Sequence, residues 1–307
     1  MLEHKGIEGF ITNIQRFSMD DGPGIRSTVF LKGCNLACIW CHNPETIPQR
    51  IQLQYIKNNC RNCGNCVAAC PNKAHVVMSD GHRLLRECCN ECLQCVSACN
   101  FGALAIVGRK VTSDEVCEDV LRDKEFYWHS GGGVTISGGE PLIQVDFCVE
   151  ILKTLRQKGI HTAIDTAGCV PQEFFDMILP NTDLILFDLK LADSVKHQAV
   201  TGQENNLILQ NLEYLCNQNV PLWIRTPLIA EINDTPTDIE QLISLLKGYQ
   251  NIQKVQLLPY HAYGTGKYAA LGMDDKTAMC SAPSEQAMQE ILDILASNGI
   301  ENVEYEK

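Results

Sequence analysis

Short apolar runs alternate with longer amphipathic segments along most of this chain. The apolar runs are rich in β-branched residues and predict six strands, at 27–32, 133–137, 161–165, 183–189, 221–226 and 254–258. The amphipathic segments predict helices at 113–123, 142–158, 171–179, 195–217, 236–248 and 284–298. Capping signals precede two of these helices, Thr112 with Glu115 and Ser284 before Glu285. Six strand–helix units in a row predict a parallel α/β sheet, either open and doubly wound or an incomplete barrel.

Chemically distinctive residues follow the predicted strands at their carboxyl ends, where α/β folds bind ligands. They are Cys34, Gly138, Gly139, Glu140, Asp165, Asp188, Lys190, Arg225, Tyr260 and His261. The segment around Gly138 and Gly139 lacks a P-loop lysine and the G-x-G-x-x-G spacing, so it does not predict a phosphate loop. Two glycines here form either a simple turn or one that lets backbone groups approach a ligand closely. Their position on the same rim as Cys34 favours a ligand site.

Three cysteines follow the first predicted strand with C-x3-C-x2-C spacing, namely Cys34, Cys38 and Cys41. Thiolates this close together can bind one metal centre from a single loop. No fourth cysteine lies in register, so a four-iron cluster held here would keep one iron open to an exogenous ligand. A zinc loop completed by His42 is the alternative, but His42 directly follows Cys41 and is poorly placed to share its metal.

A repeated cysteine pattern interrupts the strand–helix alternation between residues 51 and 104. Each copy has C-x2-C-x2-C-x3-C spacing, which resembles bacterial ferredoxins with two four-iron clusters, where the fourth cysteine of each run binds the other run's cluster. This resemblance assigns one cluster to Cys60, Cys63, Cys66 and Cys99, and the other to Cys70, Cys89, Cys92 and Cys95. Two zinc ribbons are the alternative, although zinc sites rarely place four cysteines in so compact a string.

Two departures from the ferredoxin pattern concern the second run. Asn100 replaces the proline that follows the first run, and Cys88 is a spare thiol beside Cys89. The three-residue step to Cys92 favours Cys89 as the ligand. We predict a ferredoxin-like insert at 51–104 and a barrel formed by 1–50 and 105–307.

Composition places these cysteines in a reducing compartment. The chain has 307 residues with 17 cysteines, too long to need a disulfide scaffold. It shows no signal peptide and no apolar run long enough to span a membrane. The net charge of -12 disfavours broad binding to nucleic acid or to an anionic membrane. We expect a cytoplasmic protein and, because clusters with an open iron are oxygen-labile, an anaerobic setting.

Taken together, these motifs resemble one family. The three-cysteine spacing followed by Gly138-Gly139-Glu140-Pro141 is similar to the radical S-adenosylmethionine (SAM) superfamily. Further motifs narrow the resemblance to glycyl radical enzyme activating enzymes, the relatives of pyruvate formate-lyase activase; they are Asp21-Gly22-Pro23-Gly24-Ile25-Arg26, Trp40-Cys41-His42-Asn43-Pro44-Glu45, Asp188-Leu189-Lys190, Arg225-Thr226-Pro227-Leu228-Ile229, and Leu258-Pro259-Tyr260-His261 with Tyr263, Gly264, Lys267 and Tyr268. The resemblance covers residues 9 to 298 and implies an incomplete (β/α)6 barrel.

The resemblance also implies an oxidoreductase mechanism and residue roles. A [4Fe-4S] cluster on Cys34, Cys38 and Cys41 would reduce SAM to methionine and a 5′-deoxyadenosyl radical, which removes a Cα hydrogen from a glycine of a partner enzyme. Residues implied in SAM binding are Trp40, Cys41, His42, Gly139, Asp188, Leu189, Lys190 and His261. A weaker implication is a monovalent cation near Asp165 and Asp188. The five remaining cysteines are interpreted as small apolar core residues.

Partners follow from the same resemblance. They are a glycyl radical enzyme of lyase or dehydratase type, and a reduced flavodoxin or ferredoxin as electron donor. The insert's clusters relay electrons or serve only as structural elements. Two other functional classes stay open at this point: a radical SAM enzyme that modifies a small molecule or peptide, and a plain electron carrier. An electron carrier would have no use for the three-cysteine loop or for Gly138-Gly139, which disfavours that class.

Overall fold

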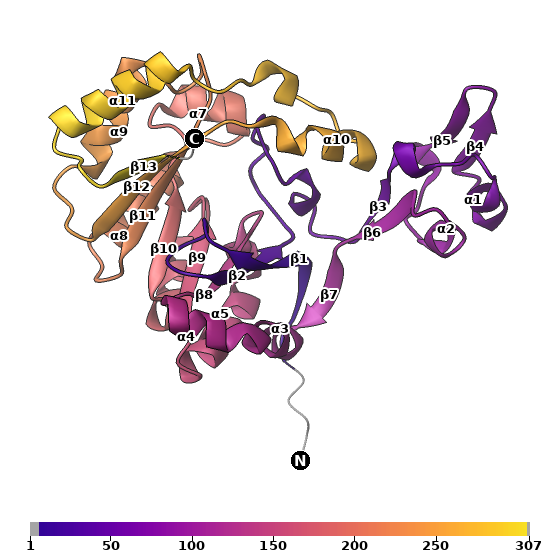
Figure 1. Cartoon of the computed structure of the whole chain (residues 1–307), viewed down its shortest axis with the longest axis horizontal. Helices are drawn as coiled ribbons and strands as arrows, with labels where there is room; N and C mark the ends of the chain where they lie inside the picture. The colour runs from indigo at the N-terminus through magenta and orange to yellow at the C-terminus, as the bar shows by residue number, and fades with distance from the viewer. Residues whose placement is uncertain (1–5, 306–307) are drawn as a thin grey trace.

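A single curved sheet organises the computed structural model, which describes residues 6–305 (Figure 1). Its strand order is β13-β12-β11-β10-β9-β8-β2-β1-β7. The strands are β1 (Glu8–Ser18), β2 (Arg26–Leu31), β7 (Arg109–Thr112), β8 (Gly133–Gly138), β9 (His161–Thr166), β10 (Leu184–Asp188), β11 (Leu222–Leu228), β12 (Ile252–Pro259) and β13 (Val303–Tyr305). All six predicted strands are present, as β2 and β8 to β12, and neighbouring members pair in parallel.

The parallel strands follow one another in chain order from β2 through β8 to β12, without the reversal of order that defines a doubly wound sheet. The sheet is curved and keeps two separate ends, β13 and β7, so it forms an incomplete barrel and that prediction is confirmed (Figure 1). At one end β1 lies between β2 and β7 and is antiparallel to both. The sequence pattern did not indicate β1, because its second half alternates between half-buried and exposed positions and lacks an apolar run. Strand β13 adds a short parallel strand at the other end.

Helices connect successive parallel strands. They are α3 (Ser113–Val120), α4 (Lys124–Ser130), α5 (Val145–Gln157), α6 (Gln172–Ile178), α7 (Ser194–Thr201), α8 (Asn206–Cys216), α9 (Pro236–Leu246), α10 (Thr265–Leu271) and α11 (Glu285–Ser297). Both predicted caps are present: Thr112 and Glu115 form a reciprocal capping box, and Ser284 accepts from the backbone of Ala287. No described helix has the length and apolar character needed to cross a bilayer.

The prediction of one helix over 195–217 is wrong, because this segment forms two helices. Helix α7 ends at Gly202, whose φ of +81° is left-handed and stops the helix. Asn205 then fixes the turn, since its side-chain amide donates to the carbonyls of Leu191 and Ala192. The apolar periodicity continues across the break and masks it.

The part of the chain from β3 to β6 leaves the barrel as a lateral lobe (Figure 1). Its elements are β3 (Gln52–Tyr55), α1 (Asn65–Ala69), β4 (His75–Met78), β5 (Gly81–Leu84), α2 (Gln94–Ser97) and β6 (Leu104–Val107). Strands β3 and β6 pair with each other and join the lobe to the barrel, while α1 and the β4–β5 hairpin lie at its far end. We call residues 51–104 the insert. Its small core contains Leu53, Leu104 and several cysteines.

Candidate functional site

A cavity of about 430 Å³ opens at the carboxyl ends of the parallel strands. It gathers most of the residues that the sequence singled out, from segments far apart in the chain. Among those lining it are Cys34, Cys38, Trp40, Cys41, His42, Gly138, Gly139, Asp165, Asp188, Lys190, Arg225, Tyr260 and His261. Parallel pairing places the carboxyl ends of all these strands on one rim of the sheet, as the sequence predicts.

The cysteine loop, residues 34–41, follows β2 directly and is held by backbone hydrogen bonds. The amide of Cys34 donates to Ile47 O (3.0 Å), and that of Cys41 donates to Cys38 O (3.1 Å). Desolvation raises the pKa of the Cys34 and Cys41 thiols to about 12 and also raises that of Cys38. The free thiols are therefore protonated near neutral pH, and binding a metal centre would release these protons.

The glycine turn at the end of β8 packs directly on the cysteine loop. A Cβ atom at Gly139 would lie 2.2 Å from Gly33 O and 2.9 Å from Cys34 Cβ, so only glycine fits. Glu140 anchors this turn from below. Its buried carboxylate accepts from Thr166 Oγ1 (2.7 Å) and from the Ala167 amide (3.0 Å), and desolvation raises its pKa to about 7.

Two carboxylates on neighbouring strands face the cavity with a cation each. Lys190 Nζ lies 2.9 Å from Asp188 Oδ2; although burial opposes it, the Asp188 carboxylate and Cys38 raise the pKa of Lys190. Arg225 Nη1 lies 3.3 Å from Asp165 Oδ2, and Asp165 Oδ1 is buried without a hydrogen-bond partner among the described residues. Desolvation raises the pKa of Asp165 to about 6.

Leu189 does not line this cavity, unlike its two neighbours. Its side chain is fully buried in the main core of the barrel. The reason is the twofold alternation of an extended chain, which points Asp188 and Lys190 to one side and Leu189 to the other. Leu189 contributes to the fold here, and its amide donates to Arg225 O (2.9 Å).

Aromatic rings also line the cavity. The rings of His42 and His261 stack with centroids 3.9 Å apart, and Tyr260 lies 5.5 Å from His42. His42 Nε2 and His261 Nδ1 are buried and have no hydrogen-bond partner within residues 6–305. Desolvation, reinforced by His261, lowers the pKa of His42 to about 4, so its ring is neutral. Trp40 is buried against Tyr260 and Ile229.

Sequence reasoning did not assign roles to Asp21 and Arg225, although both belong to motifs it noted. Asp21 Oδ2 accepts hydrogen bonds from Ser18 Oγ and Thr28 Oγ1, each 2.7 Å, and its Oδ1 lies 3.7 Å from Arg225 Nη1. The loop before β2 and strand β11 thus meet at the cavity, which both residues line. Sequence spacing alone carries no signal for such a contact.

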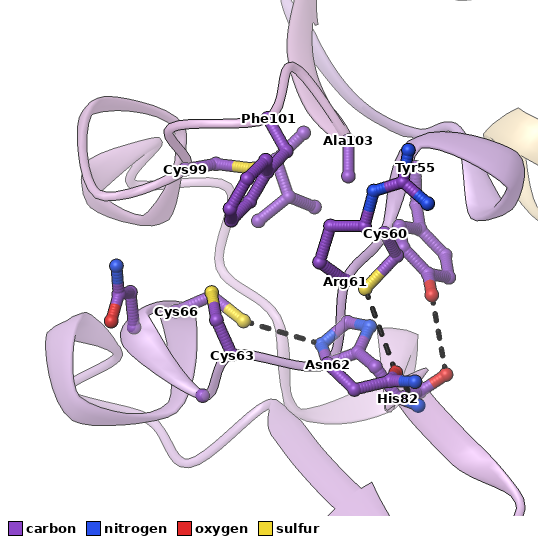
Figure 2. A pocket seen from close by; sticks show the side chains of 13 residues that line it. Tyr55, Cys60, Arg61, Asn62, Cys63, Cys66, His82, Cys99, Phe101 and Ala103 are labelled. Atoms are coloured by element: carbon purple, nitrogen blue, oxygen red, sulfur yellow. Dashed lines mark hydrogen bonds between the residues drawn. The ribbon is translucent and has the colours of Figure 1, made fainter.

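The insert holds two further groups of thiols, and the first is shown in Figure 2. One pocket brings together four cysteines from both runs, which we call the outer site: Cys60, Cys63, Cys66 and Cys99. Although burial opposes it, the backbone amides of residues 101–104 lower the pKa of the Cys99 thiol. His82 Nε2 lies 3.4 Å from Cys66 Sγ and 3.0 Å from His75 Nδ1.

The second group, the inner site, contains Cys70, Cys89, Cys92 and Cys95. These thiols affect one another electrostatically. Desolvation, reinforced by Cys70, raises the pKa of the Cys89 thiol. Desolvation, reinforced by Cys89, raises the pKa of the Cys95 thiol to about 11. Backbone amides donate to two of the sulfurs, Ala74 N to Cys70 (3.3 Å) and Glu91 N to Cys89 (3.4 Å). Cys88 is exposed, whereas Cys89 packs into the insert's core.

Two contacts tie the second cysteine run to segments outside the insert, and Arg86 makes a further one to β3 within it. Arg86 donates from Nη2 to Ala270 O of α10 (2.7 Å) and from Nη1 to Leu53 O (3.0 Å). Glu91, inside the second run, pairs with Arg50. Helix α10 in turn reaches the cysteine loop, where Tyr268 Oη donates to Cys41 O (2.9 Å). Helix α10 thus connects the second cysteine run to the cysteine loop.

Three of the five remaining cysteines are core residues. Cys117, Cys148 and Cys216 are buried in the main core, as the sequence predicts. Cys169 and Cys280 are only half-buried.

The residues present fit an iron–sulfur cluster and SAM. Three thiols on one loop supply soft ligands and leave a fourth position open toward the cavity. The cavity also offers a Lys–Asp pair, a glycine turn and unpartnered buried polar atoms on Asp165, His42 and His261. These are donors and acceptors suited to the carboxylate, ammonium and adenine groups of SAM.

Comparisons with known proteins agree with this site. Residues 28–246 match the radical SAM superfamily. The choline trimethylamine-lyase activating enzyme of Oleidesulfovibrio alaskensis is 43% identical over 281 residues, 89% of each chain. The trans-4-hydroxy-L-proline dehydratase activating enzyme of Clostridioides difficile is 42% identical over 92% of this chain and 94% of its own. A radical SAM methyltransferase structure from Sphaerobacter thermophilus matches 97% of this chain and 77% of its own, with TM-score 0.54 and 15% identity, which shows the fold alone.

Proposed function

The chain belongs to the radical SAM superfamily and, within it, to the activating enzymes of glycyl radical enzymes, and from this premise we propose how its own residues perform the reaction. The observation that carries the proposal is the meeting of Cys34, Cys38 and Cys41 with Gly139 and Lys190 around one cavity. We propose that the three thiols bind the [4Fe-4S] cluster and that the cavity binds SAM beside it.

When bound, the cluster supplies one electron to SAM, which yields methionine and the 5′-deoxyadenosyl radical that takes a hydrogen atom from the partner's glycine. The chain's residues position and shield this step. Gly139 lets the backbone approach the methionine end of SAM. Lys190, held by Asp188, places a positive charge where the SAM carboxylate would lie. The stacked rings of His42 and His261 offer a flat surface to adenine.

A monovalent cation near Asp165 and Asp188 forms part of the proposal. Asp165 Oδ1 is buried with no hydrogen-bond partner in the described part of the chain, so one carboxylate oxygen is available to a hard cation. Arg225 and Lys190 already neutralise the other oxygens, which limits the site to a single positive charge.

The partner is proposed to be a glycyl radical enzyme of lyase or dehydratase type. To test this, the protein is reconstituted anaerobically with iron and sulfide, reduced with dithionite and mixed with SAM and a candidate partner. A persistent glycine-centred doublet in the electron paramagnetic resonance spectrum supports the proposal, and a partner with that glycine replaced by alanine is the control. Formation of 5′-deoxyadenosine without a protein radical would instead favour a small-molecule or peptide substrate.

We further propose that the outer and inner sites each bind a [4Fe-4S] cluster and relay electrons toward the cysteine loop. Supporting this order, the inner site is tied to the barrel through Arg86 and Glu91, whereas α1, which carries Cys66 of the outer site, lies at the lobe's far end (Figure 1). Electrons would enter at the outer site and leave from the inner site.

Replacing Cys63 or Cys92 by serine is expected to slow activation about tenfold or more with a reduced flavodoxin or ferredoxin, because the relay loses one of its clusters. The cysteine loop is left intact, so dithionite-driven SAM cleavage is expected to persist. Single-turnover formation of 5′-deoxyadenosine with each reductant measures both. Unchanged rates with the protein donor would mean that the insert's clusters are structural.

The electron donor is proposed to be an acidic carrier protein. Residues 51–104 carry five basic and three acidic side chains, whereas the rest of the chain carries 20 and 34. Arg61 lines the outer site, and Lys57 is exposed on the turn that precedes Cys60. Such a charge contrast steers an acidic partner to the lobe.

Reversing Arg61 to glutamate is expected to slow reduction by a flavodoxin or ferredoxin about five- to tenfold at low salt and to weaken the salt dependence. Stopped-flow reduction at several ionic strengths measures this effect. Lys153→Glu, an exposed change on α5, makes the same charge difference away from the lobe and serves as the control. Equal slowing by both variants would contradict docking at the lobe.

A further inference from the structure

Two histidines of the insert have no part in the reaction described so far. His75 and His82 lie on the paired strands β4 and β5 and are almost fully buried, with 1% and 5% exposure. His75 is opposite Leu84 and His82 is opposite Val77, so the two side chains are diagonal neighbours on one face of the hairpin. Their rings stack with centroids 5.1 Å apart.

The backbone of His82 is fixed from two directions. Its amide donates to Asn62 Oδ1 (2.8 Å), and its carbonyl accepts from Tyr55 Oη (3.3 Å) (Figure 2). The Tyr55 ring also packs edge-on against the imidazole at 4.8 Å. These contacts hold the ring so that Nε2 points at Cys66 Sγ, 3.4 Å away. The surrounding contacts thus fix the His82 ring between the first cysteine run and the β4–β5 hairpin.

The position of the proton on His82 follows from what surrounds Nε2. A cysteine that binds a cluster is a thiolate, which has lone pairs and no hydrogen to donate. If Nε2 carried a lone pair, it would face the lone pairs of the sulfur at 3.4 Å. The hydrogen therefore lies on Nε2 and is shared between the Cys66 sulfur and the Nδ1 lone pair of His75, 3.0 Å away. His82 Nδ1 is then the lone-pair nitrogen, consistent with its having no partner among the described residues.

Building on the proposed cluster at the outer site, we infer that His82 donates a hydrogen bond from Nε2 to the Cys66 thiolate and so raises the reduction potential of that cluster, with His75 holding the ring in place. Reduction adds negative charge to the cluster and its sulfurs, so a donor to sulfur stabilises the reduced form more than the oxidised form. His82 acts on the cluster only through Cys66 and does not touch SAM or the glycine, so it is a positioning residue and not a catalytic one.

The inner site has a different environment at the matching position. Cys95 is the counterpart of Cys66 in the second run, and it is buried against Leu53 and Leu104. The hairpin histidines thus act on only one copy of the repeat. The outer cluster becomes the better electron acceptor from a passing carrier.

The test is a redox titration of the holoenzyme followed by electron paramagnetic resonance, with Cys63→Ser used to identify the outer cluster's signal. His82→Leu removes the donor, and His82→Gln keeps an N–H near the position of Nε2. We expect His82→Leu to shift the outer cluster's midpoint to more negative potential, His82→Gln to restore most of the shift, and the other clusters to keep their midpoints. His129→Leu, an exposed histidine of α4, is the control.

Three results would overturn the inference: an unchanged midpoint in His82→Leu, equal shifts in all clusters, or one zinc per chain bound by Cys66, His75 and His82 in place of an iron cluster. A second measurement uses the unaltered protein, in case His82→Leu does not hold its clusters. With ¹⁵N-histidine labelling, pulsed resonance of the reduced outer cluster should show a weak, hydrogen-bonded nitrogen coupling. No coupling, or the strong coupling of a directly bound nitrogen, would contradict the hydrogen bond. Loss of the relay function would leave this spectroscopic result in place, so the two proposals fail separately.

Discussion

Replacing Cys34 by alanine is expected to abolish SAM cleavage, to below about one thousandth of the unaltered rate, because the electron that breaks the C5′–S bond comes from the cofactor. Two thiols, Cys38 and Cys41, then remain on the loop, too few to hold a cluster with one open iron. The two sites in the insert have their own ligands and should still fill. The iron content is therefore expected to fall from about twelve to about eight atoms per chain, the difference being one four-iron cluster.

Iron and sulfide analysis together with 5′-deoxyadenosine formation checks this result. Cys117→Ala is the matched control, since Cys117 is a core thiol distant in sequence from both cysteine groups. Its loss costs only packing. Full SAM cleavage by Cys34→Ala, or loss of all twelve irons, would contradict the assignment of Cys34 to a separate cluster.

Replacing Gly139 by alanine should produce the next largest effect. The new Cβ would meet Gly33 O at 2.2 Å and Cys34 Cβ at 2.9 Å, so β8 and the cysteine loop must move apart. Overpacking of this kind costs about 1–3 kcal/mol, which corresponds to about ten- to hundredfold weaker binding of SAM if the strain is released in the empty cavity. Equilibrium binding of SAM to the reconstituted protein measures the change.

Gly266→Ala separates this local effect from a general loss of stability. Gly266 lies on α10 with open space around its Cα, so a methyl group there meets nothing within 4 Å. We expect normal SAM affinity and normal iron content for this variant. If Gly139→Ala bound SAM as tightly as Gly266→Ala does, the glycine turn would have no role in the close approach of SAM.

The barrel and its cavity were accessible from sequence because they depend on local signals. Six apolar runs, two capping motifs and the spacing of Cys34, Cys38 and Cys41 each act over a few residues. Parallel pairing then brings the strand ends together without further information. The error at Gly202 arose where a left-handed residue interrupts a pattern that keeps its apolar period. The short helices α4 and α10, each of seven residues, were not predicted at all.

What could not be predicted depends on contacts between distant segments. Arg86 meets Ala270 across 184 positions, and Asp21 approaches Arg225 across the barrel. The orientation of Leu189 depends on a single step of strand alternation at the end of β10. His82 could not be distinguished from an ordinary polar residue, since its neighbour Cys66 lies 16 positions earlier on another element.

The way in which the insert leaves the barrel limits how far the lobe can disturb the main sheet. Strands β3 and β6 pair so that Gln52 lies opposite Val107, which places the first and last residues of the lobe side by side. A segment whose two ends meet does not force apart the strands that it connects. Side chains cross the junction between lobe and barrel. Arg86 donates to Ala270 O, and the buried Lys32 donates to Gln52 Oε1. The lobe is therefore connected to the barrel and its cavity at one edge, through a few side chains.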